Sequence, residues 1–194
     1  MTPDAAVKAQ LRRAALSRRA ALPATVRAEF SARLTREGVA LAARHGSAAV
    51  SAFYPIRDEP DTLALLGALA GEGRATALPV TGARGTPLLF RRWRPSDPTS
   101  PGQMQIPEPR RDAPELEPDL LFVPLAAFDR RGHRIGYGAG HYDCTLARLK
   151  ARKAIVAVGV AYGVCEIEAV PDEPHDIPLD YILTEAELIA VRGA

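Results

Sequence analysis

Short apolar runs alternate with helix-forming segments along most of this chain, and this alternation constrains its fold more than any other feature. Runs that suit buried strands occupy residues 48–55, 75–80, 86–93, 119–125, 154–162 and 181–183. Helical segments occupy residues 4–21, 24–44, 58–73 and 142–153, with a further short helix expected from Glu185. Strands that alternate with helices form a mostly parallel sheet covered by helices. The sequence therefore predicts an α/β fold, a three-layer αβα arrangement with the N-terminal helices packed on the central sheet.

The totals exclude several classes of protein. A length of 194 residues suits one domain, and we expect a single domain over residues 1–194, with a proline-rich surface loop at 94–118. A net charge of +2 is too small to indicate a nucleic-acid partner. No apolar run is long enough to span a membrane. Cys144 and Cys165 are expected to be reduced thiols of a cytoplasmic protein, and nothing in the sequence demands more than a monomer.

One segment concentrates glycines between a predicted strand and a predicted helix. In FDRRGHRIGYGAGHYD, residues 128–143, Gly136, Gly138 and Gly140 fall at every second position after Arg134. Amides at a helix N-terminus attract anions, and glycines let the backbone approach phosphate oxygens. Arg134 could bind phosphate with two parallel hydrogen bonds, and Asp143 could bind magnesium beside it. The spacing matches neither a Walker A loop nor a Rossmann fingerprint, so a plain glycine-rich turn is the alternative.

The longer run VPLAAFDRRGHRIGYGAGHYD, residues 123–143, resembles the signature of 5-formyltetrahydrofolate cyclo-ligases, also called 5,10-methenyltetrahydrofolate synthetases. Further similar segments follow in order along the chain: KAQLR, FYPIRDEPDT, ALPVT, LLFRRW, IPEPR and VPDEPHDIPLDYILTE. Two positions depart from the pattern. Ala139 stands where glycine or lysine is common, and His141 replaces the usual first tyrosine. Neither departure removes a group that the chemistry of the family requires.

The resemblance implies an ATP-dependent enzyme that acts on 5-formyltetrahydrofolate. ATP phosphorylates the formyl oxygen, the N10 atom of the same substrate attacks the activated carbon, and 5,10-methenyltetrahydrofolate forms with ADP and phosphate. Because the nucleophile belongs to the substrate, no Ser-His or Cys-His pair is required. In phosphoryl transfer the protein mainly positions the reactants and stabilises charge.

The resemblance also implies a set of site residues. The ATP-binding residues would be Lys8, Arg12, Arg134, Ile135, Gly136, Tyr137, Gly138, Ala139, Gly140, His141 and Tyr142. The folate-binding residues would be Glu59, Tyr137, Gly138, Ala139, Gly140 and Tyr142, with Tyr54 and Trp93 as candidates for stacking on flat rings. Magnesium would be held by Asp143 and Asp176. Arg134 and Asp143 would be the catalytic residues.

Each of these roles has a plainer structural alternative. Lys8 and Arg12 share a helix face that could simply be solvated, and Arg134 could form a surface salt bridge. Asp143 could cap a helix and Glu59 could be a helix N-terminal acid, whereas Tyr54 and Trp93 could pack in the core. Asp172 and Asp180 compete with Asp176 as the second metal ligand.

Two other functions stay open at this point. One is a non-catalytic relative that keeps the nucleotide loop, and the other is a sugar-phosphate isomerase or CoA-transferase-like enzyme on a similar fold. The presence of Glu59, Arg134 and Asp143 together favours the cyclo-ligase.

Overall fold

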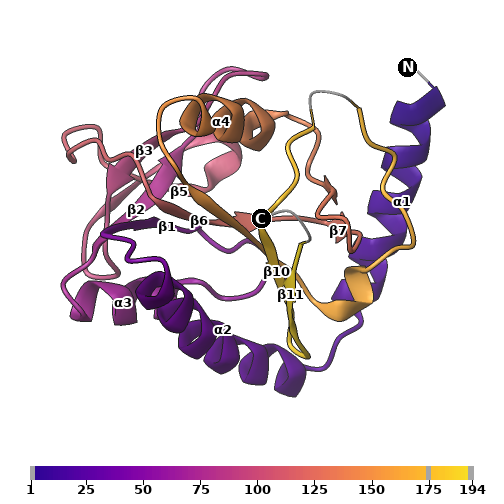
Figure 1. The fold of residues 1–194 in the computed structure, drawn as a ribbon, viewed down its shortest axis with the longest axis horizontal. Coiled ribbons are helices and arrows are strands. Elements are labelled where there is room, and N and C mark those ends of the chain that lie inside the picture. The colour runs from indigo at the N-terminus through magenta and orange to yellow at the C-terminus, as the bar shows by residue number, and fades with distance from the viewer. Residues whose placement is uncertain (1–2, 174–175, 192–194) are drawn as a thin grey trace.

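A seven-stranded sheet forms the centre of the computed structural model, which describes residues 3–173 and 176–191 (Figure 1). The strand order is β11-β10-β9-β6-β1-β2-β3. Five parallel strands form its middle: β1 (Ala49–Ser51), β2 (Ala75–Val80), β6 (Leu120–Pro124), β9 (Val156–Val160) and β10 (Tyr181–Leu183). The two edge strands are antiparallel to their neighbours: β3 (Leu89–Arg92) and β11 (Leu188–Ala190). The prediction of an α/β fold with a mostly parallel sheet is confirmed.

Helices cover both faces of this sheet. Helix α4 (His141–Lys150) lies on one face, and α2 (Ala24–Arg44) and α3 (Leu63–Gly71) lie on the other (Figure 1). Gly38 lets α2 approach its neighbours closely, because a Cβ at this position would lie only 2.7 Å from Leu65 Cδ1. The apolar side chains of the strands and of these three helices form one continuous core. The three layers therefore have the predicted order.

Helix α1 (Pro3–Ala20) stands beside the sheet rather than flat on it (Figure 1). Its main contacts are with the short helix η2 (Gly163–Cys165) and with strand β7 (Ala127–Phe128). Leu11 and Ala15 pack there in a small apolar cluster that is separate from the main core. Of the two N-terminal helices, α2 thus packs on the central sheet as expected, whereas α1 packs on the segments that lead into and out of the glycine-rich loop.

Two expectations about secondary structure are wrong. The segment 94–118 is not one continuous loop, because β4 (Thr99–Pro101) and β5 (Pro107–Pro109) form a hairpin around the short helix η1 (Gln103–Gln105). The helix expected from Glu185 is instead β11, which pairs with β10. The Thr184 hydroxyl oxygen accepts a hydrogen bond from the Glu187 N–H at 3.0 Å and so closes the turn between these two strands.

The glycine-rich segment leaves the sheet at the carboxyl end of β6. Strands β7 and β8 (Arg134–Ile135) form a two-stranded hairpin that leads into the loop before α4. The buried Asp129 carboxylate holds the turn of this hairpin by accepting backbone N–H groups of Arg131, His133 and Val170. The hairpin therefore projects the loop from the edge of the sheet where parallel strands end, which is the usual ligand-binding edge of such folds.

Within the part of the chain that the structure describes, no helix combines the length and apolar character needed to cross a membrane. Cys144 is half-buried and Cys165 is buried, and both are free thiols.

Candidate active site

Backbone geometry explains the glycines of the loop between β8 and α4. Gly138 and Gly140 have φ values of 91° and 73°, in a backbone region that residues with a Cβ atom rarely adopt. Ala139 between them has no positive φ, so the departure to alanine causes no backbone strain. Its carbonyl oxygen accepts a hydrogen bond from the Gly85 N–H at 2.9 Å. The loop is therefore joined to the segment that follows β2.

The second departure from the family pattern has a similar explanation. The Nδ1 atom of His141 lies 2.9 Å from the Thr86 carbonyl oxygen, at the first residue of α4. His141 thus makes a second connection between the loop and the segment after β2. The imidazole is used for positioning here.

Arg134 is a nearly buried cation beside this loop. Its side chain is 6% exposed, and it donates hydrogen bonds to Asp143 Oδ1 at 2.7 Å and to the Ile177 carbonyl oxygen at 2.6 Å. Burial lowers the pKa of the Arg134 guanidinium, although the charges of Asp143 and Asp176 oppose that change. Both aspartates therefore lie close enough to act on Arg134. The ion pair sits in the loop region rather than on the open surface.

Two cations of helix α1 face the same loop. Lys8 Nζ lies 3.1 Å from Asp176 Oδ2 and 3.6 Å from Glu173 Oε1. Arg12 Nε donates to the Gly136 carbonyl oxygen at 2.7 Å, and its guanidinium also lies beside Gly138. These two side chains contact protein, so they do not form a merely solvated basic face.

A second cluster lies around Glu59, which is 8% exposed. Its carboxylate accepts hydrogen bonds from the Tyr137 hydroxyl at 2.5 Å and from the Ile56 N–H at 3.0 Å. The Arg19 guanidinium is 3% exposed and donates to both Tyr137 Oη at 3.2 Å and Asp58 Oδ2 at 2.9 Å. Tyr137 therefore links the glycine-rich loop to the segment after β1 that carries Glu59.

Sequence reasoning missed Arg19 and its partner Asp58. The available signal was helical spacing, because Arg19 follows Arg12 by two turns of α1 and so lies on the same face. Burial alone would lower the pKa of Arg19, but Tyr137 and Asp58 together raise it, so this side chain is a permanent cation. It supplies positive charge next to a buried glutamate.

Burial raises the pKa of Glu59, although its hydrogen bonds from Tyr137 and Ile56 act in the opposite direction. A carboxyl group whose pKa is raised by folding stabilises the protein below the usual value of 4.5, and this contribution is lost as the pH rises through the higher folded-state pKa. We expect Glu59→Gln to gain stability relative to the unchanged protein as the pH rises from below 4.5 to neutral. Urea unfolding at a series of pH values measures this difference.

The matched control is Glu29→Gln, because Glu29 is an exposed residue of helix α2. Its stability difference from the unchanged protein should not vary with pH over the same range. Parallel pH profiles for Glu59→Gln and Glu29→Gln would contradict the shifted pKa of Glu59.

The structure places Trp93 away from the glycine-rich loop. Its backbone N–H donates to the carbonyl oxygen of Thr76, the second residue of β2, whereas the segment that contacts the loop follows the other end of β2. The indole is 5% exposed and meets the Tyr54 ring edge-on, with ring centroids 6.5 Å apart. The structure gives Trp93 a packing role, and its contact with a substrate ring stays a prediction, as does that of the half-buried Tyr54.

Comparison with known proteins agrees with this arrangement. The model of the 5-formyltetrahydrofolate cyclo-ligase family matches residues 4–185. The chain belongs to this family. A cyclo-ligase of Haemophilus influenzae is 32% identical over 85% of this chain and 90% of its own length. One of Mycolicibacterium smegmatis is 34% identical over 95% of this chain and 97% of its own length.

Solved structures extend the same comparison. A 5,10-methenyltetrahydrofolate synthetase of Aquifex aeolicus, solved by NMR, is 29% identical with a TM-score of 0.80, over 97% of this chain and 94% of that one. A synthetase of Mycoplasma pneumoniae has a TM-score of 0.71 at 21% identity, which supports the fold alone. As a member of the cyclo-ligase family the chain is an enzyme of folate metabolism.

The charged groups around the loop suit a polyphosphate with a bound cation. Lys8 pairs with Asp176 and Arg134 pairs with Asp143, whereas Arg12 lies beside Gly136 and Gly138 of the loop. Among residues 3–173 and 176–191, no cluster of three or more His, Cys, Asp or Glu side chains could hold a metal ion alone. Magnesium commonly takes one or two carboxylates and completes its shell with phosphate oxygens and water. Two aspartates beside a phosphate site fit that pattern.

Proposed function

We propose that this member of the cyclo-ligase family converts 5-formyltetrahydrofolate to 5,10-methenyltetrahydrofolate and in doing so converts ATP to ADP and phosphate. The observation that carries the proposal is that Arg12 and Arg134 lie at a loop with two left-handed glycines at the start of α4, while Lys8 pairs with Asp176, whose charge also acts on Arg134. Such a loop offers backbone N–H groups and guanidinium groups to the same anion.

The proposed chemistry starts from the weakness of the substrate as an electrophile. In an N-formyl group the nitrogen donates into the carbonyl, so the carbon resists attack. Transfer of the γ-phosphoryl group of ATP to the formyl oxygen releases ADP and turns that oxygen into a leaving group. The substrate's N10 then attacks the formyl carbon and loses its proton to solvent, phosphate departs with the oxygen, and the five-membered ring closes. The protein has to align the two substrates and balance their charge.

In this proposal Lys8, Arg12 and Arg134 bind the phosphates of ATP, and Asp143 and Asp176 hold magnesium. The bound ion supplies charge neutralisation for the phosphate oxygens. In the structure Arg134 pairs with Asp143 and Lys8 pairs with Asp176. Phosphate binding then exchanges one set of opposite-charge contacts for another, so no buried charge is left without a partner.

The cluster around Glu59 is proposed to bind the folate. A carboxylate accepts hydrogen bonds well from the adjacent N–H donors of the amino-pyrimidine in the pterin ring. Tyr137 and Arg19 hold Glu59 and Asp58 in place, and Tyr142 lies close enough to Glu59 for the two to interact electrostatically. The folate site thus adjoins the loop proposed for the phosphates, as transfer between the two substrates requires.

The test uses the extended chromophore of the methenyl product, which the formyl substrate lacks. Protein, 5-formyltetrahydrofolate, magnesium and ATP are mixed, and the near-ultraviolet absorbance is followed. We expect product only when both ATP and magnesium are present, with one ADP formed per product molecule. Product formed equally well without ATP, or no product at all, would refute the proposal.

No observation in the structure favours the isomerase, the CoA-transferase-like enzyme or the non-catalytic relative. The monomeric state, the single-domain organisation and the cytoplasmic location stay predictions.

A further inference from the structure

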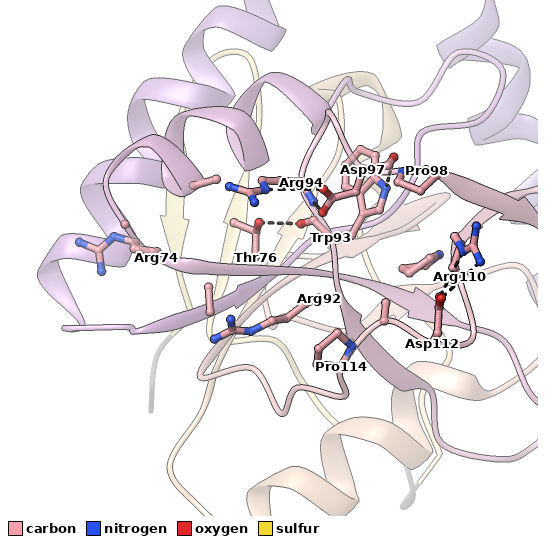
Figure 2. Close-up of a pocket in the computed structure, with 15 residues that line it drawn as sticks. Arg74, Thr76, Arg92, Trp93, Arg94, Asp97, Pro98, Arg110, Asp112 and Pro114 are labelled. Carbon is pink, nitrogen blue, oxygen red and sulfur yellow. Dashed lines mark hydrogen bonds and ion pairs between the residues drawn. The ribbon is translucent and has the colours of Figure 1, made fainter.

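A cavity of about 770 Å³ opens at the end of β2 that is remote from the glycine-rich loop (Figure 2). It surrounds Thr76 and Trp93, whereas the loop contacts the segment after Val80. Residues 77–80 of β2 lie between Thr76 and that segment, a separation of roughly 17 Å at about 3.3 Å per residue. This cavity is therefore distinct from the proposed catalytic site.

The cavity is lined by more positive than negative charge. Four arginines from three segments line it, against two aspartates: Arg74, Arg92, Arg94 and Arg110, with Asp97 and Asp112. Arg94 and Arg110 pair with the aspartates, and Arg74 pairs with Glu72 outside the lining. In the described part of the chain the Arg92 guanidinium has no hydrogen bond or ion pair, and Figure 2 draws none for it.

A charge on an edge strand often serves only to prevent pairing with another sheet. That role does not explain Arg92. The outer edge of β3 is already covered, because the Arg92 N–H donates to the Pro114 carbonyl oxygen at 2.8 Å and the Leu116 N–H donates to the Phe90 carbonyl oxygen at 3.0 Å. Protection of an edge would also not require further arginines on other segments, such as Arg74 and Arg110.

The walls of the cavity are held in place by local contacts. The Thr76 hydroxyl donates to the Trp93 carbonyl oxygen at 2.6 Å, and the Trp93 indole N–H donates to the Asp97 carbonyl oxygen at 3.1 Å. Prolines at 98, 109 and 114 restrict the backbone around the opening. A cavity fixed in this way loses little conformational freedom when it binds a ligand.

We propose that this cavity is a second anion-binding site, which takes a small phosphate-bearing molecule with Arg92 as its main ligand. A guanidinium offers two parallel N–H groups to a phosphate, and Arg92 has both free. The exposed pairs of Arg94 and Arg110 are weak, so a phosphate can compete with their aspartates. The volume is in the range of small-molecule sites, about 300–1,000 Å³.

Trp93 gives this site its own reporter, because it is the single tryptophan of the sequence. Its indole N–H signal in a ¹⁵N–¹H spectrum is followed while inorganic pyrophosphate is added at constant ionic strength without magnesium. We expect a saturable shift in the unchanged protein and about tenfold weaker binding in Arg92→Gln. Arg92→Lys keeps the positive charge but loses the two parallel N–H donors, so its affinity for pyrophosphate should lie between those of the unchanged protein and Arg92→Gln.

Two control variants locate the effect. Arg111→Gln removes an exposed arginine outside the cavity, and it should leave the titration unchanged. Arg134→Lys alters the proposed ATP site, and it should also keep the shift. Formation of the methenyl product should be unaffected by Arg92→Gln.

Several results would overturn the inference. The first two are a titration of the unchanged protein without a saturable shift, and a shift of the same size and midpoint in well-folded Arg92→Gln. The other two are loss of the shift in Arg134→Lys, and a shift of the same size with succinate, which has two charges and no phosphate.

Discussion

Arg134→Lys is expected to lower kcat about a hundredfold or more and to raise the KM for ATP. Lysine keeps the positive charge but cannot donate in two fixed directions, whereas Arg134 holds both Asp143 and the Ile177 carbonyl oxygen. Lysine is preferred to alanine because the side chain is only 6% exposed, so alanine would leave Asp143 without its cation and would confound folding with catalysis. Steady-state rates at varied ATP concentration measure the effect.

Arg130→Lys is the matched control for this change. Arg130 lies in the turn of the same hairpin but is exposed, and it forms ion pairs with Glu166 and Glu187. Its replacement should leave kcat and both KM values near those of the unchanged enzyme. If Arg134→Lys also kept its ATP KM and kcat, the assignment of Arg134 to the phosphates would be wrong.

Arg19→Met should cost about 3 kcal/mol of unfolding free energy and should raise the KM for 5-formyltetrahydrofolate. The substitution leaves Asp58 without its cation and removes a donor from Tyr137, next to the buried Glu59. The orientation of Tyr137 toward Glu59 is then no longer fixed. Urea unfolding measures the first effect and initial rates at varied folate concentration measure the second.

Arg18→Met is the control, because Arg18 is the neighbouring exposed residue and donates a hydrogen bond to the Val164 carbonyl oxygen. It should change stability by less than about 1 kcal/mol and leave both KM values intact. Equal stabilities for the two variants would show that the Arg19 cluster contributes nothing. A raised KM for ATP alone, with that for folate unchanged, would place Arg19 with the phosphates instead.

Local sequence patterns predicted the helices and strands that have a clear hydrophobic pattern or that pair with a segment nearby in the sequence. The boundaries of α2 and β2 agree with the expected ones, since each combines a clear period with a proline or glycine at its end. The last strand, β11, was missed because Glu185 and Glu187 just before it favour a helix, while its hydrogen bonds to β10 depend on a turn around Thr184. Prolines hid the β4–β5 hairpin, because such a two-stranded ribbon can leave their missing N–H groups on an outer edge.

The candidate site also shows which contacts local sequence patterns can predict and which they cannot. Lys8, Arg12 and Arg134 could be named as candidate cations, because they occur in segments that resemble the family pattern. The link from Arg19 through Tyr137 to Glu59 could not, since it joins three segments that are distant in the sequence. Trp93 was a reasonable candidate for ring stacking by residue type, but the direction of β3 carries it to the other end of β2.

Helix α1 has one consequence for the control of this enzyme. It contributes Lys8, Arg12 and Arg19 while sharing few apolar contacts with the main core. Because these three cations lie on one helix, any displacement of α1 relative to the sheet would move all of them together.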